Sequence, residues 1–146
     1  MFRHSKSSSL LLMVAILMLL TGACSIPNLD TAECSEARPA VREFYSFHFA
    51  NEMTTSAANL EARKRFLTDR LFETLAASPT DADVFTTGTT DVPRAFRHGG
   101  CETDANGRAV FDVLLFWRDE EHTKQRTVKV EAEKQNGKWL IDRVSY

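Results

Sequence analysis

Two Asn-Gly dipeptides, at residues 106–107 and 136–137, are the feature that most constrains how this chain can fold. Asn-Gly is typical of the two-residue turn of a β-hairpin, because both central residues of that turn adopt positive φ angles. Around these turns the side chains alternate between two faces, as they do in strands. The expected strands are residues 93–103, which Gly99-Gly100 interrupts, 108–118, 123–135 and 138–146, and the alternation is clear in 108–118 and 123–135. With a polar turn at residues 119–122, they predict an antiparallel meander of four strands.

The alternation also predicts which side chains face the core. In residues 108–118 one face carries an apolar column, and the opposite face includes Asp112. In residues 123–135 apolar residues alternate with charged ones, so this strand is expected to have one buried face and one exposed face. The expected inward set comprises Phe111, Val113, Leu115, Trp117, Val128, Val130 and Ala132.

The first half of the chain has helical periodicity instead. A helix is expected to begin near residues 36–39 and to end near Asn51, and its aromatic residues on more than one face imply that it is covered on most sides. Residues 56–78 keep helical spacing, and Thr68 can cap a new helix, so two short helices are expected there. The turn-rich residues 79–91 are interpreted as either a functional lid or a mobile loop.

An uninterrupted apolar run, LLLMVAILMLL at residues 10–20, follows the basic residues Arg3 and Lys6 near the N-terminus. As a helix this run rises about 16 Å, roughly half of a hydrocarbon core of about 30 Å. It is therefore too short for a stable membrane span, and it predicts a signal peptide, residues 1–23, that is removed from the mature protein.

The end of this run, Leu20-Thr21-Gly22-Ala23-Cys24, resembles the bacterial lipobox, although Thr21 stands where the usual lipobox has Leu. The resemblance implies that Cys24 carries acyl chains, which would anchor the protein stably in a membrane of the cell envelope. Ser25 follows, whereas an Asp there would resemble an inner-membrane retention signal, so a periplasm-facing position on the outer membrane is expected. The alternatives are an ordinary secretory signal with an incidental cysteine and an uncleaved anchor.

The mature chain is expected to comprise a lipidated tether, residues 24–36, and a single domain, residues 37–146. With a formal net charge of −2 before cleavage, the chain offers no electrostatic basis for binding nucleic acid. Its one dense basic cluster, Arg63-Lys64-Arg65, is interpreted as a solvated helix face, with a lipid-headgroup contact as the alternative. If Cys24 is acylated, Cys34 and Cys101 remain as an even pair, either bridged or as two separate buried thiols.

Helices followed by a curved antiparallel meander predict an α+β fold, and this order resembles the nuclear-transport-factor-two-like (cystatin-like) cone. The segments that carry the resemblance are Val41-Arg-Glu-Phe-Tyr-Ser, Phe66-Leu-Thr-Asp-Arg-Leu-Phe and Gly137-Lys-Trp-Leu-Ile-Asp-Arg-Val. Together with the lipobox, they make the chain most similar to a bacterial lipoprotein family with a domain of unknown function, number 3828. That family offers no catalytic residues to transfer to this chain.

The sequence contains no recognisable catalytic, cofactor-binding or metal-binding motif, so no cofactor is expected. His48 lies on the aromatic helix and is either a hydrogen-bonded core histidine or a proton shuttle in a cavity. Asp112 and Asp142 lie within apolar strands, where a carboxylate inside a cone can act as a general base. The aromatic residues are numerous enough to fill a small cone, leaving a shallow pocket at its open end with Tyr45, His48 and Trp117 at the rim.

Two classes of function follow. The first is a non-enzymatic binding or interaction module, which holds a small apolar ligand or meets a protein partner in the envelope. The second is a small cone-fold enzyme, an isomerase, dehydratase or hydrolase, that uses His48 with a carboxylate. They differ in whether His48 and a carboxylate share an open cavity.

Overall fold

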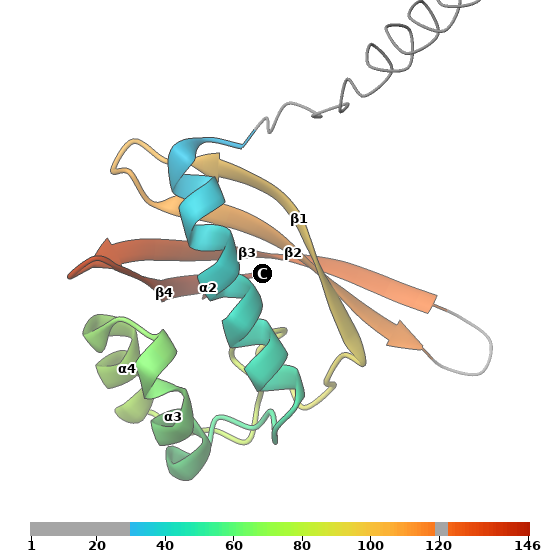
Figure 1. Cartoon of the computed structure of the whole chain (residues 1–146). Helices are drawn as coiled ribbons and strands as arrows, with labels where there is room; N and C mark the ends of the chain where they lie inside the picture. Colours follow the sequence, from blue (N-terminus) through green and yellow to red (C-terminus); the bar gives the residue numbers. More distant parts are fainter. Residues whose placement is uncertain (1–29, 119–122) are drawn as a thin grey trace, which may run out of the picture.

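The computed structural model describes residues 30–118 and 123–146, which form an α+β structure (Figure 1). The described helices are α2 (Ala32–Phe49), α3 (Ala57–Arg63), the 3₁₀ helix η1 (Lys64–Phe66) and α4 (Asp69–Ala76). The strands are β1 (Ala95–Thr103), β2 (Ala109–Arg118), β3 (Thr123–Gln135) and β4 (Lys138–Ser145). The expected signal peptide, Cys24, Ser25 and the polar turn at residues 119–122 lie outside the described residues.

The four strands form one antiparallel sheet in the order β1-β2-β3-β4, which confirms the predicted meander. Asn136 and Gly137 both have positive φ angles, 51° and 79°, as a tight hairpin turn requires. The register shifts once in β1, between His98 and Cys101, and once in β4, where the consecutive residues Glu131 and Ala132 pair with Arg143 and Ile141. Such bulges bend strands, and the sheet curves around α2 in Figure 1.

Helix α2 begins earlier than the sequence indicated. The side chain of Thr31 accepts a hydrogen bond from the backbone N–H of Cys34 and caps the helix, which starts at Ala32. Pro39 lies inside the helix. The prediction of a tether reaching residue 36 is therefore wrong, because residues 32–36 already form the first turn of α2. By contrast, Thr68 caps α4 as predicted, through a 3.2 Å bond from the N–H of Leu71.

The core lies between α2 and the face of the sheet that α2 crosses (Figure 1). The predicted inward column is buried, and only Trp117, at its end, is partly exposed. Leu67 pairs with Ile141, and the N–H of Thr68 donates to the carbonyl of Ile141 at 2.9 Å, so the α3–α4 segment is attached to β4. In residues 30–118 and 123–146 no helix is long and apolar enough to cross a membrane.

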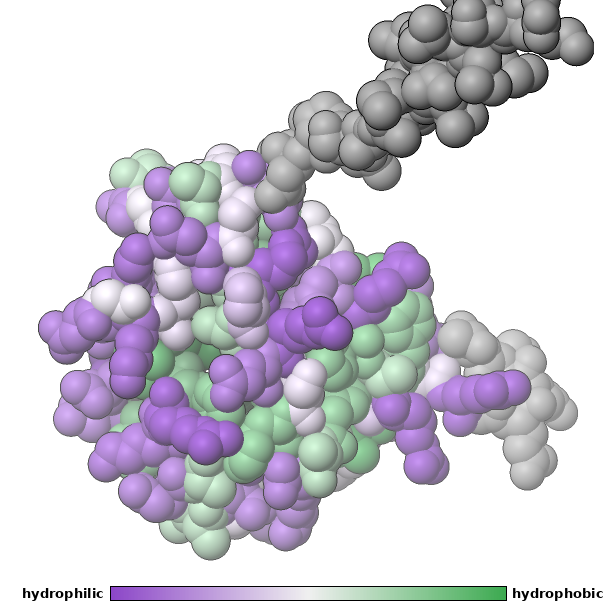
Figure 2. Space-filling model, in the orientation of Figure 1, coloured by the Kyte–Doolittle hydropathy of each residue, from purple (hydrophilic) through white to green (hydrophobic). Residues whose placement is uncertain are grey.

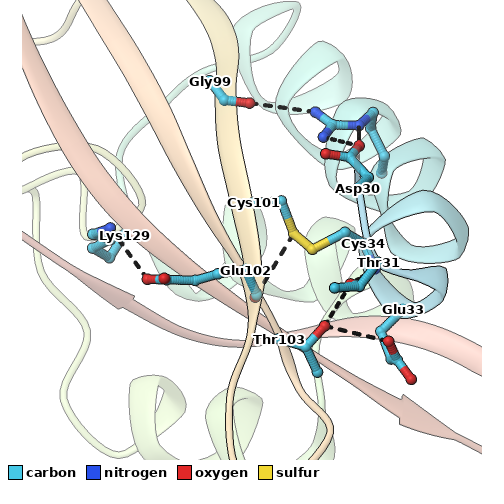
Figure 3. The surroundings of a disulfide bond; sticks show 10 residues. Asp30, Thr31, Glu33, Cys34, Gly99, Cys101, Glu102, Thr103 and Lys129 are labelled. Atoms are coloured by element: carbon cyan, nitrogen blue, oxygen red, sulfur yellow. Dashed lines mark hydrogen bonds and ion pairs between the residues drawn. A yellow bond between two sulfur atoms is a disulfide. The ribbon is translucent and has the colours of Figure 1, made fainter. Parts of the chain in front are cut away.

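A disulfide joins Cys34, in the first turn of α2, to Cys101, at the bulge of β1 (Figure 3). The two Cα atoms are 5.9 Å apart, and the bond closes a loop with a sequence separation of 67. In the chain-entropy model a loop of this length stabilises the folded state by about 4 kcal/mol. Beside the disulfide, the hydroxyls of Thr31 and Thr103 lie 2.5 Å apart, so the start of α2 is held to β1 at two points.

Candidate functional site

A groove opens where α2 stops covering the sheet. It lies between the end of α2, the segment at residues 90–94 that leads into β1, and the paired ends of β2 and β3, and its volume is about 750 Å³. Its apolar residues are Phe49, Met53, Val92, Pro93 and Trp117, and its charged residues are Asp91, Arg94, Arg118 and Lys124. On the face shown in Figure 2, hydrophobic residues gather where α2 ends and β1 begins.

Trp117 is one of the residues that line this groove. It follows Leu115 in the inward column of β2, but α2 no longer covers the sheet at this point, so the indole stays partly exposed. Its Nε1–H donates to the carbonyl of Asp91 at 3.3 Å, and the N–H of Arg94 donates to the carbonyl of Phe116 at 2.7 Å. These two bonds hold the segment at residues 90–94 against the end of β2 and thereby shape one wall of the groove.

Two cations lie close to the indole of Trp117. The register of β2 and β3 places Lys124 opposite Trp117 and Arg126 opposite Leu115, so both cations lie on the same face of the sheet as the apolar column. The Nζ atom of Lys124 is 5.2 Å from the centroid of the Trp117 ring, and the guanidinium carbon of Arg126 is 6.0 Å from it. Lys124 also lies 3.5 Å from the carboxylate of Asp91.

His48 lies elsewhere, inside the core. Its side chain is fully buried, and its Nε2 atom is 3.0 Å from Oδ1 of the equally buried Asp83. The Nε–H of Arg63 donates to Nδ1 of His48 at 2.8 Å. Nδ1 is therefore an acceptor, and Nε2 carries the proton that is donated to Asp83. The imidazole bridges a cation and an anion, and burial lowers the pKa of the Arg63 guanidinium.

The expected pocket rim is wrong at two of its three residues. Tyr45 and His48 have no exposed surface, and the hydroxyl of Tyr45 donates to the carbonyl of Phe85 at 2.8 Å. Both are covered because residues 79–91, interpreted as a lid or a mobile loop, insert Asp83 and Phe85 into the core. Trp117 does line the groove, but its neighbours there are Phe49 and Met53.

The carboxylates considered as general bases do not contact His48. Asp112 lies on the other face of β2 and forms an ion pair of 2.7 Å with Lys129. Asp142 is only 2% exposed and accepts a 2.7 Å hydrogen bond from the hydroxyl of Thr68, with Arg70 as a second partner. The acid that pairs with His48 is Asp83, which sequence reasoning placed in a loop and did not select.

Arg63 was also missed, since the cluster Arg63-Lys64-Arg65 was interpreted as a solvated helix face. That interpretation holds for Lys64 and Arg65, but it is wrong for Arg63, which is 1% exposed. Arg63 also donates to the backbone carbonyls of Asn59 and Glu52. The helical spacing of Arg63 from Leu60 and Leu67 was the available signal, because it places Arg63 beside the buried stripe of the segment.

Within the part of the chain that the structure describes, no three His, Cys, Asp or Glu side chains are grouped closely enough to hold a metal ion. The groove itself presents an apolar wall and charged side chains at its rim. Aromatic and aliphatic walls with a few polar groups are typical of small-molecule sites, and sites of this kind span about 300–1,000 Å³.

Comparison with known proteins gives a fold relationship alone. No protein-family model and no curated protein matches this chain. Among solved structures, a crystal structure of a protein of unknown function from Bacteroides thetaiotaomicron is similar, with a TM-score of 0.51 and 19% sequence identity. The match covers 94% of this chain and 99% of that chain. Membership in the lipoprotein family noted from the sequence motifs stays a prediction.

Proposed function

We propose that this chain is a membrane-anchored envelope lipoprotein whose folded domain is a non-enzymatic binding module, with the groove around Trp117 as its ligand site. The observation that carries the proposal is the partly exposed indole of Trp117 in a groove that combines apolar and charged side chains. Large apolar residues in an exposed hollow are typical of surfaces that bind something. Phe49 and Met53 complete the apolar wall.

We also propose the finer fold class, a nuclear-transport-factor-two-like cone. Three features support it: a four-stranded meander, two bulges that bend it, and a long helix across one face. A ligand of such a cone is expected to enter at its open end, and the groove is lined by the end of β2 and the start of β3.

A binding function is better supported than catalysis because His48 is buried and both of its ring nitrogens are hydrogen-bonded. A histidine beside a carboxylate can serve as a general base only if a substrate reaches it. Here the side chains of His48 and Asp83 have no exposed surface, and Arg63 occupies the other ring nitrogen. This arrangement matches a structural ion network better than a catalytic pair.

Anchoring through Cys24 is part of the proposal and rests on the lipobox-like residues, which lie outside the described residues. Acylation at Cys24 would leave the domain close to the membrane surface, because fewer than ten residues separate it from Thr31, the cap of α2. A binding module held in this position would meet ligands in the periplasm, at the membrane surface, or both.

The test is intrinsic fluorescence of a protein in which Trp117 is the only tryptophan. The chain has two tryptophans, and the second, Trp139, lies on β4, so the variant Trp139→Phe isolates the signal of the groove. Small apolar compounds should change the emission of Trp117 saturably in this variant. If no member of a panel of neutral, anionic and cationic amphiphiles does so while the protein stays folded, the groove is not a ligand site.

A further inference from the structure

The apolar column on the inner face of the sheet ends in positive charge. Along β2 this column is aliphatic and aromatic up to Trp117, and the residues of β3 that pair with its last two members are Arg126 and Lys124. Both cationic groups lie within about 6 Å of the indole ring. A ligand that rests on Trp117 therefore has both cations and apolar side chains close to it.

The cations of the groove outnumber its acids. Arg94, Arg118 and Lys124 line it, whereas Asp91 is its one described carboxylate. Asp91 is engaged by Lys124 and is 62% exposed, so water screens this pair strongly. Among the described residues no carboxylate forms an ion pair with Arg94, Arg118 or Arg126. The described groove thus has an excess of positive charge that an anion can neutralise.

We infer that the groove binds amphipathic anions, with the apolar chain against Phe49, Met53 and Trp117 and the anionic head group at Lys124 and Arg126. This inference rests on the proposed function, since it names the class of ligand for the same site. A neutral apolar compound makes contacts with the apolar side chains but leaves the cations unpaired. A small inorganic anion pairs with the cations but leaves the apolar side chains exposed. An amphiphile with a carboxylate or phosphate head group makes both kinds of contact.

The experiment compares two ligands with the same chain, dodecanoate and dodecanol, as monomers at neutral pH and low salt. The protein is the mature chain from Ser25, which contains every described helix and strand and the disulfide, with Trp139→Phe so that Trp117 reports binding. Circular dichroism checks that each variant is folded. Dodecanoate should bind roughly 10-fold more tightly than dodecanol, which corresponds to two partly screened ion pairs. The difference should shrink as salt is added.

The matched variants separate the contribution of the ligand's head group to the affinity from that of its alkyl chain. Lys124→Gln with Arg126→Gln should bring the affinity for dodecanoate down to that for dodecanol and leave dodecanol unchanged. Lys138→Gln, at the start of β4 and opposite the far end of β3, should change neither affinity.

The outcomes distinguish the inference from the function on which it rests. Equal affinity for dodecanoate and dodecanol would overturn the inference and leave the groove as an apolar binding site. A lack of saturable binding by either compound would overturn both. The last measurement uses vesicles of neutral lipid, with and without an anionic lipid. If the protein binds the anionic vesicles through Lys124 and Arg126 but does not bind monomeric dodecanoate, the cations contact a membrane surface. That result would overturn the inference.

Discussion

Replacing Asp83 with alanine should be among the most destabilising single changes in this protein. The carboxylate is fully buried and accepts hydrogen bonds from the imidazole of His48 at 3.0 Å, from the N–H of Phe85 at 2.9 Å and from the hydroxyl of Thr86 at 2.5 Å. It is also the buried anion of the network in which Arg63 is the cation. Its removal leaves three donors without an acceptor and a buried guanidinium without a counter-charge.

The size of the effect follows from these contacts. Each buried donor left unsatisfied costs about 1–3 kcal/mol, and breaking a buried ion network from one side costs about 3–5 kcal/mol. These two descriptions count the same loss, so the free energy of unfolding should fall by roughly 3–5 kcal/mol. The free energy of unfolding of natural domains is only about 5–15 kcal/mol, so Asp83→Ala should leave this protein with little remaining stability.

Urea unfolding followed by far-UV circular dichroism, with the disulfide intact, measures this change. Asp83→Asn keeps the shape and one acceptor oxygen but removes the charge, so it should lose about half as much stability. Asp81→Ala, two residues away and exposed, is the matched control and should stay within about 0.5 kcal/mol of the unmodified chain. A loss below about 1 kcal/mol in Asp83→Ala would refute the view that this network holds residues 79–91 in the core.

Three further changes test other parts of the structure. Burial, together with the charge of Asp83, raises the pKa of Tyr45 well above its usual 10.0. The stabilisation from this neutral phenol is therefore fully present below pH 10 and is lost as the pH rises above that value. The melting temperature of Tyr45→Phe should then fall less steeply in alkali than that of the unmodified chain. At neutral pH the free energy of unfolding of this variant should be about 1 kcal/mol lower, because the hydrogen bond to the carbonyl of Phe85 is lost. Phe111→Ala removes a fully buried ring and should lower the free energy of unfolding by roughly 3–5 kcal/mol in urea, and a protein that unfolds like the unmodified chain would contradict the packed core. Metabolic labelling with a palmitate analogue should mark the natural chain and not Cys24→Ala, and equal labelling of both would contradict acylation at Cys24.

Much of the fold was accessible from the sequence because the responsible interactions are local. The turn at Asn136-Gly137 needs residues that accept positive φ, and the dipeptide Asn-Gly by itself predicts such a turn. The alternation in β2 and β3 has the period of a strand, so the buried column from Phe111 onward could be read directly. Thr68 caps α4 through a bond to a residue three positions later, which is again a local pattern.

The site depended on contacts between distant segments. His48 and Trp117 were both candidates for the pocket rim, and nothing in their own neighbourhoods separates them. Tertiary structure separates them, because residues 79–91 bring Asp83 onto His48, whereas α2 ends before it can cover Trp117. The start of α2 was misplaced for a related reason: its first turn is joined to β1 by the disulfide of Cys34 and by the contact of Thr31 with Thr103.

The sequence alone therefore determined the strands, the turn at Asn136-Gly137, the inward column and the succession of helices, because each follows from period and local hydrogen bonding. Only the tertiary structure decided which polar residues are enclosed and which remain at the surface. That decision requires a charged group such as Asp83 to find its partners across 35 positions of chain, at His48, and the free energy of burying it depends on whether those partners are present. No property of Asp83 or His48 in isolation contains this information.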